Sequence, residues 1–368
     1  MSNQSVNITV SYGGESGTIP GGAQNIRLTM AGARGGTGGF DSGGPGGGSG
    51  NGRVGTFNIP TSSSNRSWAG YIGLVGSNGP GGAGATFGGP GGQNGPVSGD
   101  GGRGGNDGLS GWSGCGGGGG AASVFVLAGS RVAVAGGGGG GGGGSFSCGG
   151  PQRPGGRGGD AGGWTNTTNV TLSNGGQGGD KSGDGAGGGG GGGGAPGGGG
   201  GGVGQDCSNG GGGGGGGGSR YNGSVLSLTS QSTNSNNGYM SLSYTVKIAE
   251  ITSFTVNPTT IIAGQSATLS WSVTDSTSQS INNGVGAVAT SGSTTVSPNV
   301  SRVYTLTAIG DAGNDTASVT LTVYQPVITV LTASPDPIIA GQSSTLSWTV
   351  SGDASQASID QGIGPVLF

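Results

Sequence analysis

Residues 131–144 read RVAVAGGGGGGGGG, so a short apolar segment runs directly into an unbroken glycine tract. The segment 131–135 is typical of a short β-strand, whereas polyglycine offers no side chain that could be buried in a core. Further near-pure glycine tracts occupy residues 187–194 and 210–218, and most of the 103 glycines of the 368-residue chain lie between residues 35 and 218. The fold of this region therefore depends on what the glycine tracts do.

Two physical states compete for the tracts. In the first they are flexible linkers, because glycine loses more conformational entropy on ordering than any other residue. In the second they are extended left-handed helices with about three residues per turn, which pack closely because no Cβ lies between them, as at the collagen axis. Collagen itself is excluded, since the glycines keep no strict one-in-three period and the chain has only 15 prolines.

Three features of the sequence favour the ordered state. Apolar strands recur between the tracts, strands that can pair bracket the region, and three tryptophans lie within or beside it, at Trp68, Trp112 and Trp164. A linker needs none of these. We therefore expect a bundle of polyglycine helices in which the backbone groups of neighbouring tracts hydrogen-bond laterally, since glycine offers no other polar group.

Short strands are expected around and between the tracts. Polar and apolar residues alternate at 7–12, 25–31 and 237–246, which is the period of a half-buried strand, and a turn is expected at 18–22. The other expected strands are 54–59, 69–75, 123–127, 131–135 and 168–172. The pattern predicts an all-β, glycine-rich domain over residues 1–248 with essentially no α-helix.

An internal repeat follows, after the composition changes to Ser, Thr and Val at Ile251. Residues 258–273, PTTIIAGQSATLSWSV, correspond to residues 335–350, PDPIIAGQSSTLSWTV, at a spacing of 77 residues. This spacing is the size of a small β-sandwich. The repeat therefore predicts one domain at 249–324 and a second, incomplete one at 325–368.

Alternating residues in the repeats indicate two packed antiparallel sheets. The expected strands of the first repeat are 267–273, 303–308 and 318–323. Trp271 and Trp348 are expected in the core rather than stacked on a ligand, because an alternating strand turns them inward.

The second repeat has no counterpart of the strands expected between residues 289 and 323. Half a sandwich cannot bury its sheet. We expect that the chain continues beyond Phe368, that another chain completes these strands, or that they end as a partial docking element.

Catalytic and metal-binding chemistry is poorly supplied. Histidine is absent, which removes the commonest general base and the commonest metal ligand. The spacing of Cys115, Cys148 and Cys207 matches no zinc-binding pattern. These cysteines could form one disulfide and leave one free thiol, or all three could be thiols. Most carboxylates follow Gly or Asn, as in Asx turns, although a paired acid site is the alternative. Glycine patterns of the phosphate-binding kind precede no expected helix. We expect no enzyme, no cofactor and no metal.

Charge and hydropathy limit the partners. Only 7% of the residues are charged and the net charge is −3, so no basic field could hold a nucleic acid. No apolar run reaches the roughly 18 residues that a membrane-spanning helix needs, so membrane insertion is not expected. The first eight residues show no basic segment followed by an apolar one, so no secretory signal is recognised.

Residues 7–246 resemble the glycine-rich domain of phage and bacterial surface proteins and, more distantly, the ligand-binding region of the anaplastic lymphoma kinase receptor family. The motifs that carry this resemblance are GTIPGGAQNIRL at 17–28, GGGGGAASV at 116–124, RVAVAGG at 131–137 and NGYM at 237–240. The resemblance implies a β-scaffold that carries polyglycine helices in a hexagonal array.

Residues 251–368 resemble bacterial and phage immunoglobulin-like repeats through AGQSATLSW at 263–271. The resemblance implies spacer modules that bind carbohydrates or surfaces weakly, and it supplies no catalytic residues.

An adhesive composition without a recognised secretory signal is typical of a phage virion protein, which is made in the host cytoplasm and released by lysis. We expect a tail fibre, tail-tip or baseplate-associated component of the virion that contributes to host-surface attachment. Its expected partners are other virion or tail proteins and a host cell-surface glycan or protein, and a homo-oligomer is open. A bacterial cell-surface or extracellular matrix adhesin and a capsid decoration protein are the alternatives.

Three aromatic residues are candidates for contact with the host surface, because aromatic rings in surface loops stack on sugars. They are Trp112, Trp164 and Tyr221. The alternative for each is packing at the edge of its own domain.

Overall fold

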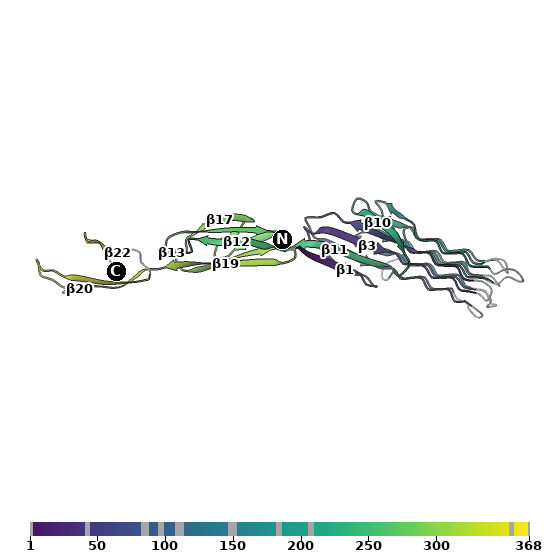
Figure 1. Ribbon diagram of the computed structural model, residues 1–368, viewed down its shortest axis with the longest axis horizontal. Helices are drawn as coiled ribbons and strands as arrows, with labels where there is room; N and C mark the ends of the chain where they lie inside the picture. Colours follow the sequence, from purple (N-terminus) through teal and green to yellow (C-terminus); the bar gives the residue numbers. More distant parts are fainter. Residues whose placement is uncertain are drawn as a thin grey trace. The chain divides into compact units, whose positions relative to one another are not determined.

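The computed structural model describes residues 3–40, 45–81, 88–94, 99–106, 114–145, 153–181, 186–204, 210–352 and 357–366. Within these ranges the regular elements are all strands, which confirms the all-β class without α-helix (Figure 1). No helix that could cross a membrane therefore occurs in the described part of the chain. Ser5–Val246 form one compact unit and Lys247–Phe368 belong to another.

A five-stranded sheet joins the two ends of the first unit. Its order is β1-β11-β3-β4-β10. The strands are β1 (Asn3–Thr9), β3 (Gln24–Ala31), β4 (Gly52–Asn58), β10 (Ser227–Asn234) and β11 (Tyr239–Lys247). Leu28 and Met30 of β3 lie opposite Leu242 and Met240 of β11, and all four side chains are fully buried. The alternation expected at 25–31 and 237–246 thus buries one face of this sheet.

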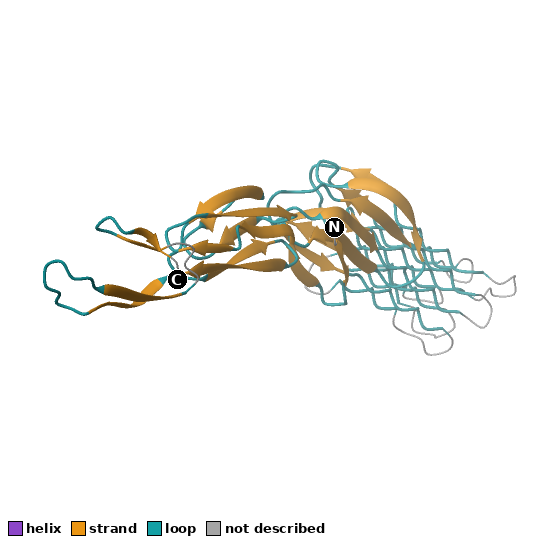
Figure 2. Ribbon diagram, turned by 60° about the vertical axis from the view of Figure 1, so that its left-hand side comes forward, coloured by secondary structure: helices purple, strands orange, loops and turns teal. Residues whose placement is uncertain are grey.

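A six-stranded sheet forms the rest of the scaffold, in the order β2-β5-β6-β7-β9-β8. Figure 2 shows the strands of the molecule in orange and the extended glycine segments as loops. The strands are β2 (Glu15–Ile19), β5 (Arg66–Tyr71), β6 (Ser123–Leu127), β7 (Ser130–Ala135), β8 (Trp164–Asn166) and β9 (Ser219–Tyr221). The β6–β7 hairpin turns at Ala128 and Gly129, which both have positive φ, as the tight turn between twisted strands requires.

The sequence expectations need correction at several places. The strand expected at 69–75 ends at Tyr71, the strand expected at 7–12 ends at Thr9, and β2 extends into the turn expected at 18–22. Residues 168–172 are not a strand; Val170 is buried there and Leu172 partly so, and both pack against Val124 and Val134. Their alternation comes from a loop that packs on the sheet. Conversely, β10 was not expected, because this edge strand is rich in Ser, Thr and Gln and is almost entirely exposed on both faces.

The backbone hydrogen bonds of the tract 136–144 point toward its neighbours in directions that repeat every three residues. Successive amides donate to three different segments. Every third amide from Gly137 donates to residues 187–193, and every third from Gly138 donates to residues 33–39. The remaining amides, of Gly139 and Gly142, donate to residues 156–159. The carbonyls accept from three further segments, at 211–217, 114–120 and 47–50. All these N···O distances are 2.7–3.0 Å. Six extended segments therefore surround this tract.

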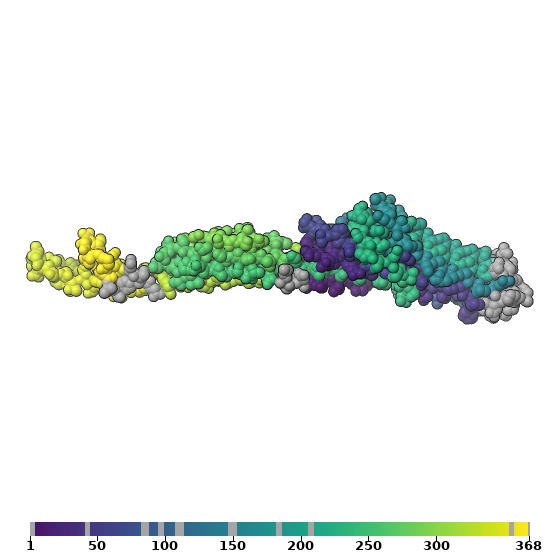
Figure 3. All heavy atoms as spheres, turned by 45° about the horizontal axis from the view of Figure 1, so that its top comes forward, coloured from purple at the N-terminus to yellow at the C-terminus, as the bar shows by residue number. Residues whose placement is uncertain are grey.

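Close approach of backbones explains why the interior of the array is glycine. A Cβ on Gly139, Gly140 or Gly141 would lie 2.0 Å from a backbone oxygen of a different neighbour in each case. No side chain fits at such a distance, so consecutive positions are all restricted. By contrast, a Cβ on Gly199 or Gly202 would meet nothing within 4 Å. On the face drawn in Figure 3, the atoms of the tracts form a closely packed body.

The first repeat is a sandwich of two sheets, with the strand orders β12-β14-β17 and β13-β19-β18-β15-β16. The strand pairs are antiparallel except β13–β19, which is parallel. The strands are β12 (Glu250–Asn257), β13 (Thr260–Ile262), β14 (Ala267–Thr274), β15 (Ser278–Ile281), β16 (Gly286–Ala287), β17 (Ser291–Val296), β18 (Arg302–Ile309) and β19 (Asn314–Tyr324). The strands expected at 267–273, 303–308 and 318–323 are confirmed.

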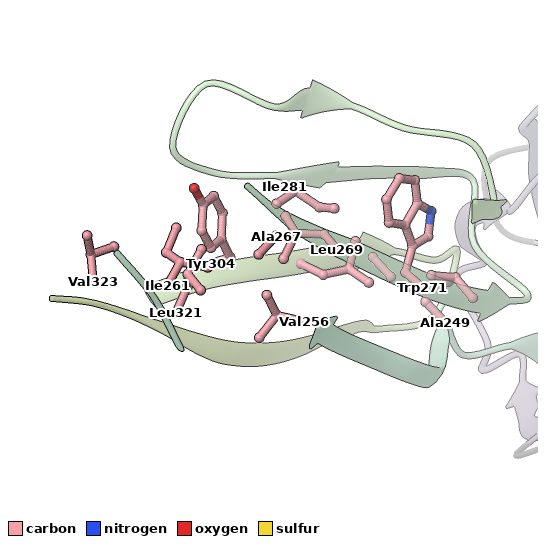
Figure 4. Packing of buried hydrophobic residues seen from close by; sticks show 13 residues of the cluster. Ala249, Val256, Ile261, Ala267, Leu269, Trp271, Ile281, Tyr304, Leu321 and Val323 are labelled. Atoms are coloured by element: carbon pink, nitrogen blue, oxygen red, sulfur yellow. The ribbon is translucent and has the colours of Figure 1, made fainter. Parts of the chain in front are cut away.

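Side chains from both sheets fill the core of this sandwich (Figure 4). Leu269, Leu306 and Leu321 are fully buried, and Trp271 is 7% exposed. The Trp271 Nε1–H donates to the Ala289 carbonyl at 2.9 Å, which satisfies its one polar group. The prediction that Trp271 is a core residue is confirmed.

The second repeat contains two hairpins in its described residues. They pair β20 (Val327–Ser334) with β21 (Thr345–Ser351), and β22 (Ala357–Ile359) with β23 (Gly364–Val366). Trp348 is only half-buried, so the expectation of a core position is wrong for this residue. The reason is that no described strand of this repeat covers the face on which Trp348 lies.

Candidate surface-contact site

A polar groove lies along the outside of the glycine array, between three of its peripheral segments. It encloses about 370 Å³. Its lining residues are Pro90, Gly91, Gly92, Gln93, Asp100, Gly101, Gly102, Arg103, Asn174, Gly175 and Gln177. Several charged and amide side chains converge in this groove.

Three-residue spacing places these side chains on the outside. One segment carries Asp100, Arg103 and Asn106, and a neighbouring one carries Asn174, Gln177 and Asp180. The glycines between them face inward: a Cβ on Gly101 would lie 1.9 Å from the Gly119 oxygen, and one on Gly102 would lie 2.0 Å from the Gly176 oxygen. Every third position is therefore the one that can hold a side chain.

Arg103 is held in place by partners on both segments. Its Nη2 donates to the two carboxylate oxygens of Asp180 at 3.0 and 3.2 Å, and its Nη1 donates to the Gly104 carbonyl and to Asn106 Oδ1. The two side chains are 33% and 53% exposed, so solvent screens the pair and it contributes little to stability. Its effect is to fix the guanidinium at one end of the groove.

The Asp180 carboxylate is held in its charged form. The backbone N–H of Asn106 donates to it at 2.8 Å and lowers its pKa most, partial burial opposes this, and Arg103 lowers the pKa further. The net shift is downward. Asp180 therefore acts as a fixed anion and not as a proton donor near neutral pH.

Asn174 and Asp100 join three segments through their side-chain oxygens. Asn174 Oδ1 accepts from the backbone N–H groups of Gly99 and Asp100 at 2.7 and 3.0 Å, and Asp100 Oδ1 accepts from Asn94 N–H at 2.8 Å. Gln93 and Gln177 are exposed beside them. The groove thus combines rigidly placed groups with two adaptable amides, and both donors and acceptors are present for a polyhydroxylated ligand.

The aromatic candidates lie elsewhere. Trp164 on β8 and Tyr221 on β9 are half-buried and pack around Phe57, with ring centroids 4.8 and 5.4 Å from that of Phe57. The Trp164 Nε1–H donates to the Val54 carbonyl at 2.8 Å. The structure brings these two rings together, and their surface role stays a prediction. Trp112 lies outside the described residues.

The cysteines and carboxylates form no further site in the described residues. Cys115 is buried, whereas Cys148 and Cys207 lie outside the described ranges. Asp160 accepts from Asn51 N–H and from Arg157, and these bonds lower its pKa although partial burial, the largest single contribution, raises it. Among the described side chains no group of three potential metal ligands occurs.

Hydrogen bonds place the ends of several tracts at one end of the array. Gly39 accepts from Gly144, Pro80 from Cys115, Asn106 from Lys181, Ala186 from Gly204, and Ser145 pairs with Arg153. These residues lie next to the ends of the described ranges. Phe40 lies at the same end with 65% of its surface exposed.

Comparison with known proteins gives little functional information. No family model matches the chain. A stretch of 114 residues is 36% identical to a protein of Ruminiclostridium cellulolyticum that is described as an uncharacterized protein. The stretch makes up 30% of this chain and 32% of the relative. The chain thus matches about a third of that relative's length.

The polar groove was missed by sequence reasoning, which singled out aromatic side chains. The signal was present in the spacing, since Asp100, Arg103 and Asn106 follow one another at intervals of three within glycine. What the sequence does not contain is the neighbour of each segment, so the convergence with Gln93 and Gln177 could not be foreseen.

Proposed function

We propose that the glycine tracts form a bundle of polyglycine II-type helices on the β-scaffold, and that residues 249–324 are an immunoglobulin-like domain. A hydrogen-bond direction that repeats every three residues supports the first assignment, because a left-handed helix with about three residues per turn aims consecutive amides at three different neighbours. Two packed sheets with the buried Trp271 support the second.

We propose that the chain is a structural phage virion protein, a tail fibre, tail-tip or baseplate-associated component that contributes to host-surface attachment. The observation that carries the proposal is the glycine array itself: interior glycines such as residues 139–141 leave no room for a Cβ, whereas every third residue of the peripheral segments 100–106 and 174–180 carries a side chain. Such a body can change its surface residues without repacking its interior, which suits a receptor-contacting module. The resemblance to glycine-rich domains of phage and bacterial surface proteins points the same way.

The partner of the groove is a host glycan in this proposal. Amide, carboxylate and guanidinium groups converge there from Gln93, Asp100, Arg103 and Gln177. Protein-bound sugars are held by such planar polar groups through their hydroxyls. In the same proposal, the two repeats bind other virion or tail proteins, and the chain can also form a homo-oligomer.

A bacterial cell-surface adhesin is the second candidate. The similarity to a protein of the bacterium Ruminiclostridium cellulolyticum favours it. Mass spectrometry separates the two: the virion proposal expects the protein in purified particles, and its detection on uninfected cells but not in particles would overturn that proposal.

Adsorption competition tests attachment. The purified full chain should slow phage adsorption, and the double variant Gln93→Ala, Gln177→Ala should compete about tenfold or more less well, as expected when a polar ligand loses two hydrogen-bonding partners. The exposed Gln342→Ala is the matched control, because it makes the same change in the other unit. Equal competition by all three proteins would exclude the groove, and no competition by any of them would exclude attachment.

A further inference from the structure

A further pocket lies at one end of the first sandwich, where β18 begins. It encloses about 630 Å³. Its walls are the turn between β15 and β16, the C-terminal half of β17 with the loop that follows it, and the start of β18. All its lining residues lie between 283 and 304. The pocket shares no residue with the polar groove of the glycine-rich unit and plays no part in the function proposed above.

Arg302 carries the charge of this pocket, since every other residue of the lining is neutral. β18 runs from Arg302 to Ile309, and a strand of eight residues is roughly 23 Å long. The remaining charged residues of the segment 247–324 lie toward the far end of the strands; they are Lys247, Glu250, Asp275, Asp311 and Asp315. No carboxylate of the sandwich therefore lies beside the guanidinium.

A neutral amide holds the Arg302 guanidinium in place. Arg302 Nη1 donates to Asn283 Oδ1 at 3.3 Å, and Asn283 Nδ2 donates to the Val303 carbonyl at 2.8 Å. By contrast, Arg103 of the glycine-rich unit pairs with Asp180. Within the described residues Arg302 makes no ion pair with a carboxylate. Most of its five N–H donors are therefore open to a ligand.

The Tyr304 hydroxyl is a second donor that reaches this pocket. Tyr304 is 2% exposed and its ring belongs to the core, but the residue also lines the pocket, and Figure 4 shows its hydroxyl directed away from Leu321. Among the described residues this hydroxyl makes no hydrogen bond. Burial raises the pKa of Tyr304 more than the Arg302 charge lowers it, so the hydroxyl stays protonated. A buried hydroxyl without an acceptor is costly, and an anionic ligand would supply one.

The strand β17 adds hydroxyl groups to the lining. Thr294 and Thr295 belong to this strand, which is the outer one of the sheet β12-β14-β17, and Ser297 follows it. The Ser297 hydroxyl also bonds to that of Ser266 at 2.8 Å. The apolar part of the lining consists of Val285, Val296 and Pro298. One cation, one phenol and several aliphatic hydroxyls thus surround the same space.

We propose that this pocket binds the acidic sugar of a glycan, with Arg302 and Tyr304 donating to its carboxylate and the β17 side chains bonding its hydroxyls. Guanidinium and carboxylate groups match in a planar, charge-assisted pair. A volume of about 630 Å³ lies within the range of roughly 300–1,000 Å³ that is usual for small-molecule sites. A peptide acid is a poorer match, because hydroxyl groups beside one guanidinium suit a ring that carries several hydroxyls next to its carboxylate.

Titration of the full chain with sodium glucuronate, followed by NMR, tests the proposal. We expect saturable shifts of the β17 and β18 amides and of the Arg302 Nε–H. Methyl glucoside has the ring hydroxyls without the carboxylate, and inorganic phosphate has the charge without the ring, so each should bind about tenfold or more weakly. Equal binding of either probe would overturn the proposal. So would tighter binding of a blocked tetra-aspartate peptide, since the partner would then be an acidic polypeptide.

Two substitutions assign the binding to this pocket. Arg302→Gln should weaken glucuronate binding about tenfold or more, because charge-assisted hydrogen bonds are lost. The exposed Arg27→Gln in the glycine-rich unit is the matched control and should bind like the unsubstituted protein.

Tyr304→Phe should also weaken binding, but without lowering the thermal stability of the sandwich, because its hydroxyl has no protein partner to lose among the described residues. This variant keeps the test decisive if Arg302→Gln does not fold. Unchanged binding by the folded variants, or shifts confined to residues of the polar groove, would overturn the proposal. Because the readout is local to β17 and β18, the result is independent of whether the polar groove binds a glycan.

Discussion

The tract 136–144 and the sandwich at 249–324 are both ordered, but different interactions stabilise them. The tract has no side chains, and all nine of its amides donate to neighbouring segments. The sandwich buries Leu269, Trp271, Leu306 and other apolar side chains in a core. A net hydrogen bond contributes about 0.5–1.5 kcal/mol, whereas burial of a Leu side chain contributes about 1.5–3 kcal/mol.

The comparison shows that the interior of a protein can be specified by the absence of side chains as well as by their packing. In the tract, residues 136–143 must each lack a Cβ, so substitution at these positions is nearly forbidden. In the sandwich, each position must be apolar and of suitable volume, so isosteric exchange costs less than about 1.5 kcal/mol. Substitutions in the tract should therefore destabilise the protein by adding atoms, and substitutions in the sandwich by removing them.

The largest effect is expected from Gly140→Val. A Cβ there would lie 2.0 Å from the Gly117 oxygen, and backbone on all sides leaves no room for adjustment. We expect loss of more than about 3 kcal/mol from the glycine-rich unit. Gly199→Ala is the matched control, because its Cβ meets nothing within 4 Å; it should be neutral or stabilise by about 0.4–1 kcal/mol. Thermal unfolding followed by calorimetry measures both, and equal destabilisation would contradict the packing account.

Leu306→Ala should come next, with a loss of about 2–5 kcal/mol confined to the sandwich. Leu306 is fully buried, so the substitution leaves a cavity in a core of side chains. Leu331→Ala is the control in the second repeat; since Leu331 is 59% exposed, a change within about 0.5 kcal/mol is expected. Denaturant-dependent exchange of the β14 amides gives the first value, and that of the β21 amides gives the second. Similar losses would mean that the second repeat is closed in solution.

Ser123→Ala tests a side chain that joins the scaffold to the glycine region. Its buried hydroxyl donates to the Ala31 carbonyl at 2.6 Å and accepts from Gly73 N–H at 3.1 Å. Removal leaves two buried backbone groups without this partner, for a loss of about 1–3 kcal/mol. The exposed Ser227→Ala is the control and should unfold like the unsubstituted protein. A loss as small as that of the control would show that water replaces the hydroxyl.

The smallest effect concerns pH. Because the folded pKa of Asp180 is lowered, its contribution to stability is present above the unfolded pKa, near the ordinary value of 3.8, and is lost as pH falls through the lower folded value. The group is exposed, so the loss is slight. Asp180→Asn should flatten this part of the stability–pH curve, measured by denaturant unfolding between acidic and neutral pH. An unchanged curve would exclude Asp180 as the source.

Sequence alone was sufficient where side chains carry a period. The alternation at 25–31 and 267–273 predicted β3 and β14, and the repeated AGQS motif located the sandwich. It was misleading at 168–172, where the same alternation packs a loop.

The arrangement of the tracts could not be predicted, because identical glycines carry no information about which segment lies next to which. The pairing of Gly137 with Gly193 is set by the strands that lead into the tracts, such as β7. For the same reason, the sequence could show that polar residues recur every three positions, but not that they meet in one groove.

Hydrogen exchange of the amides of residues 136–144 in the full chain tests the central claim most directly. If lateral hydrogen bonds between tracts hold the region together, these amides should be among the most slowly exchanging of the glycine-rich unit, comparable with β3 and β11. Exchange at the rate of an unstructured polyglycine peptide would contradict the account.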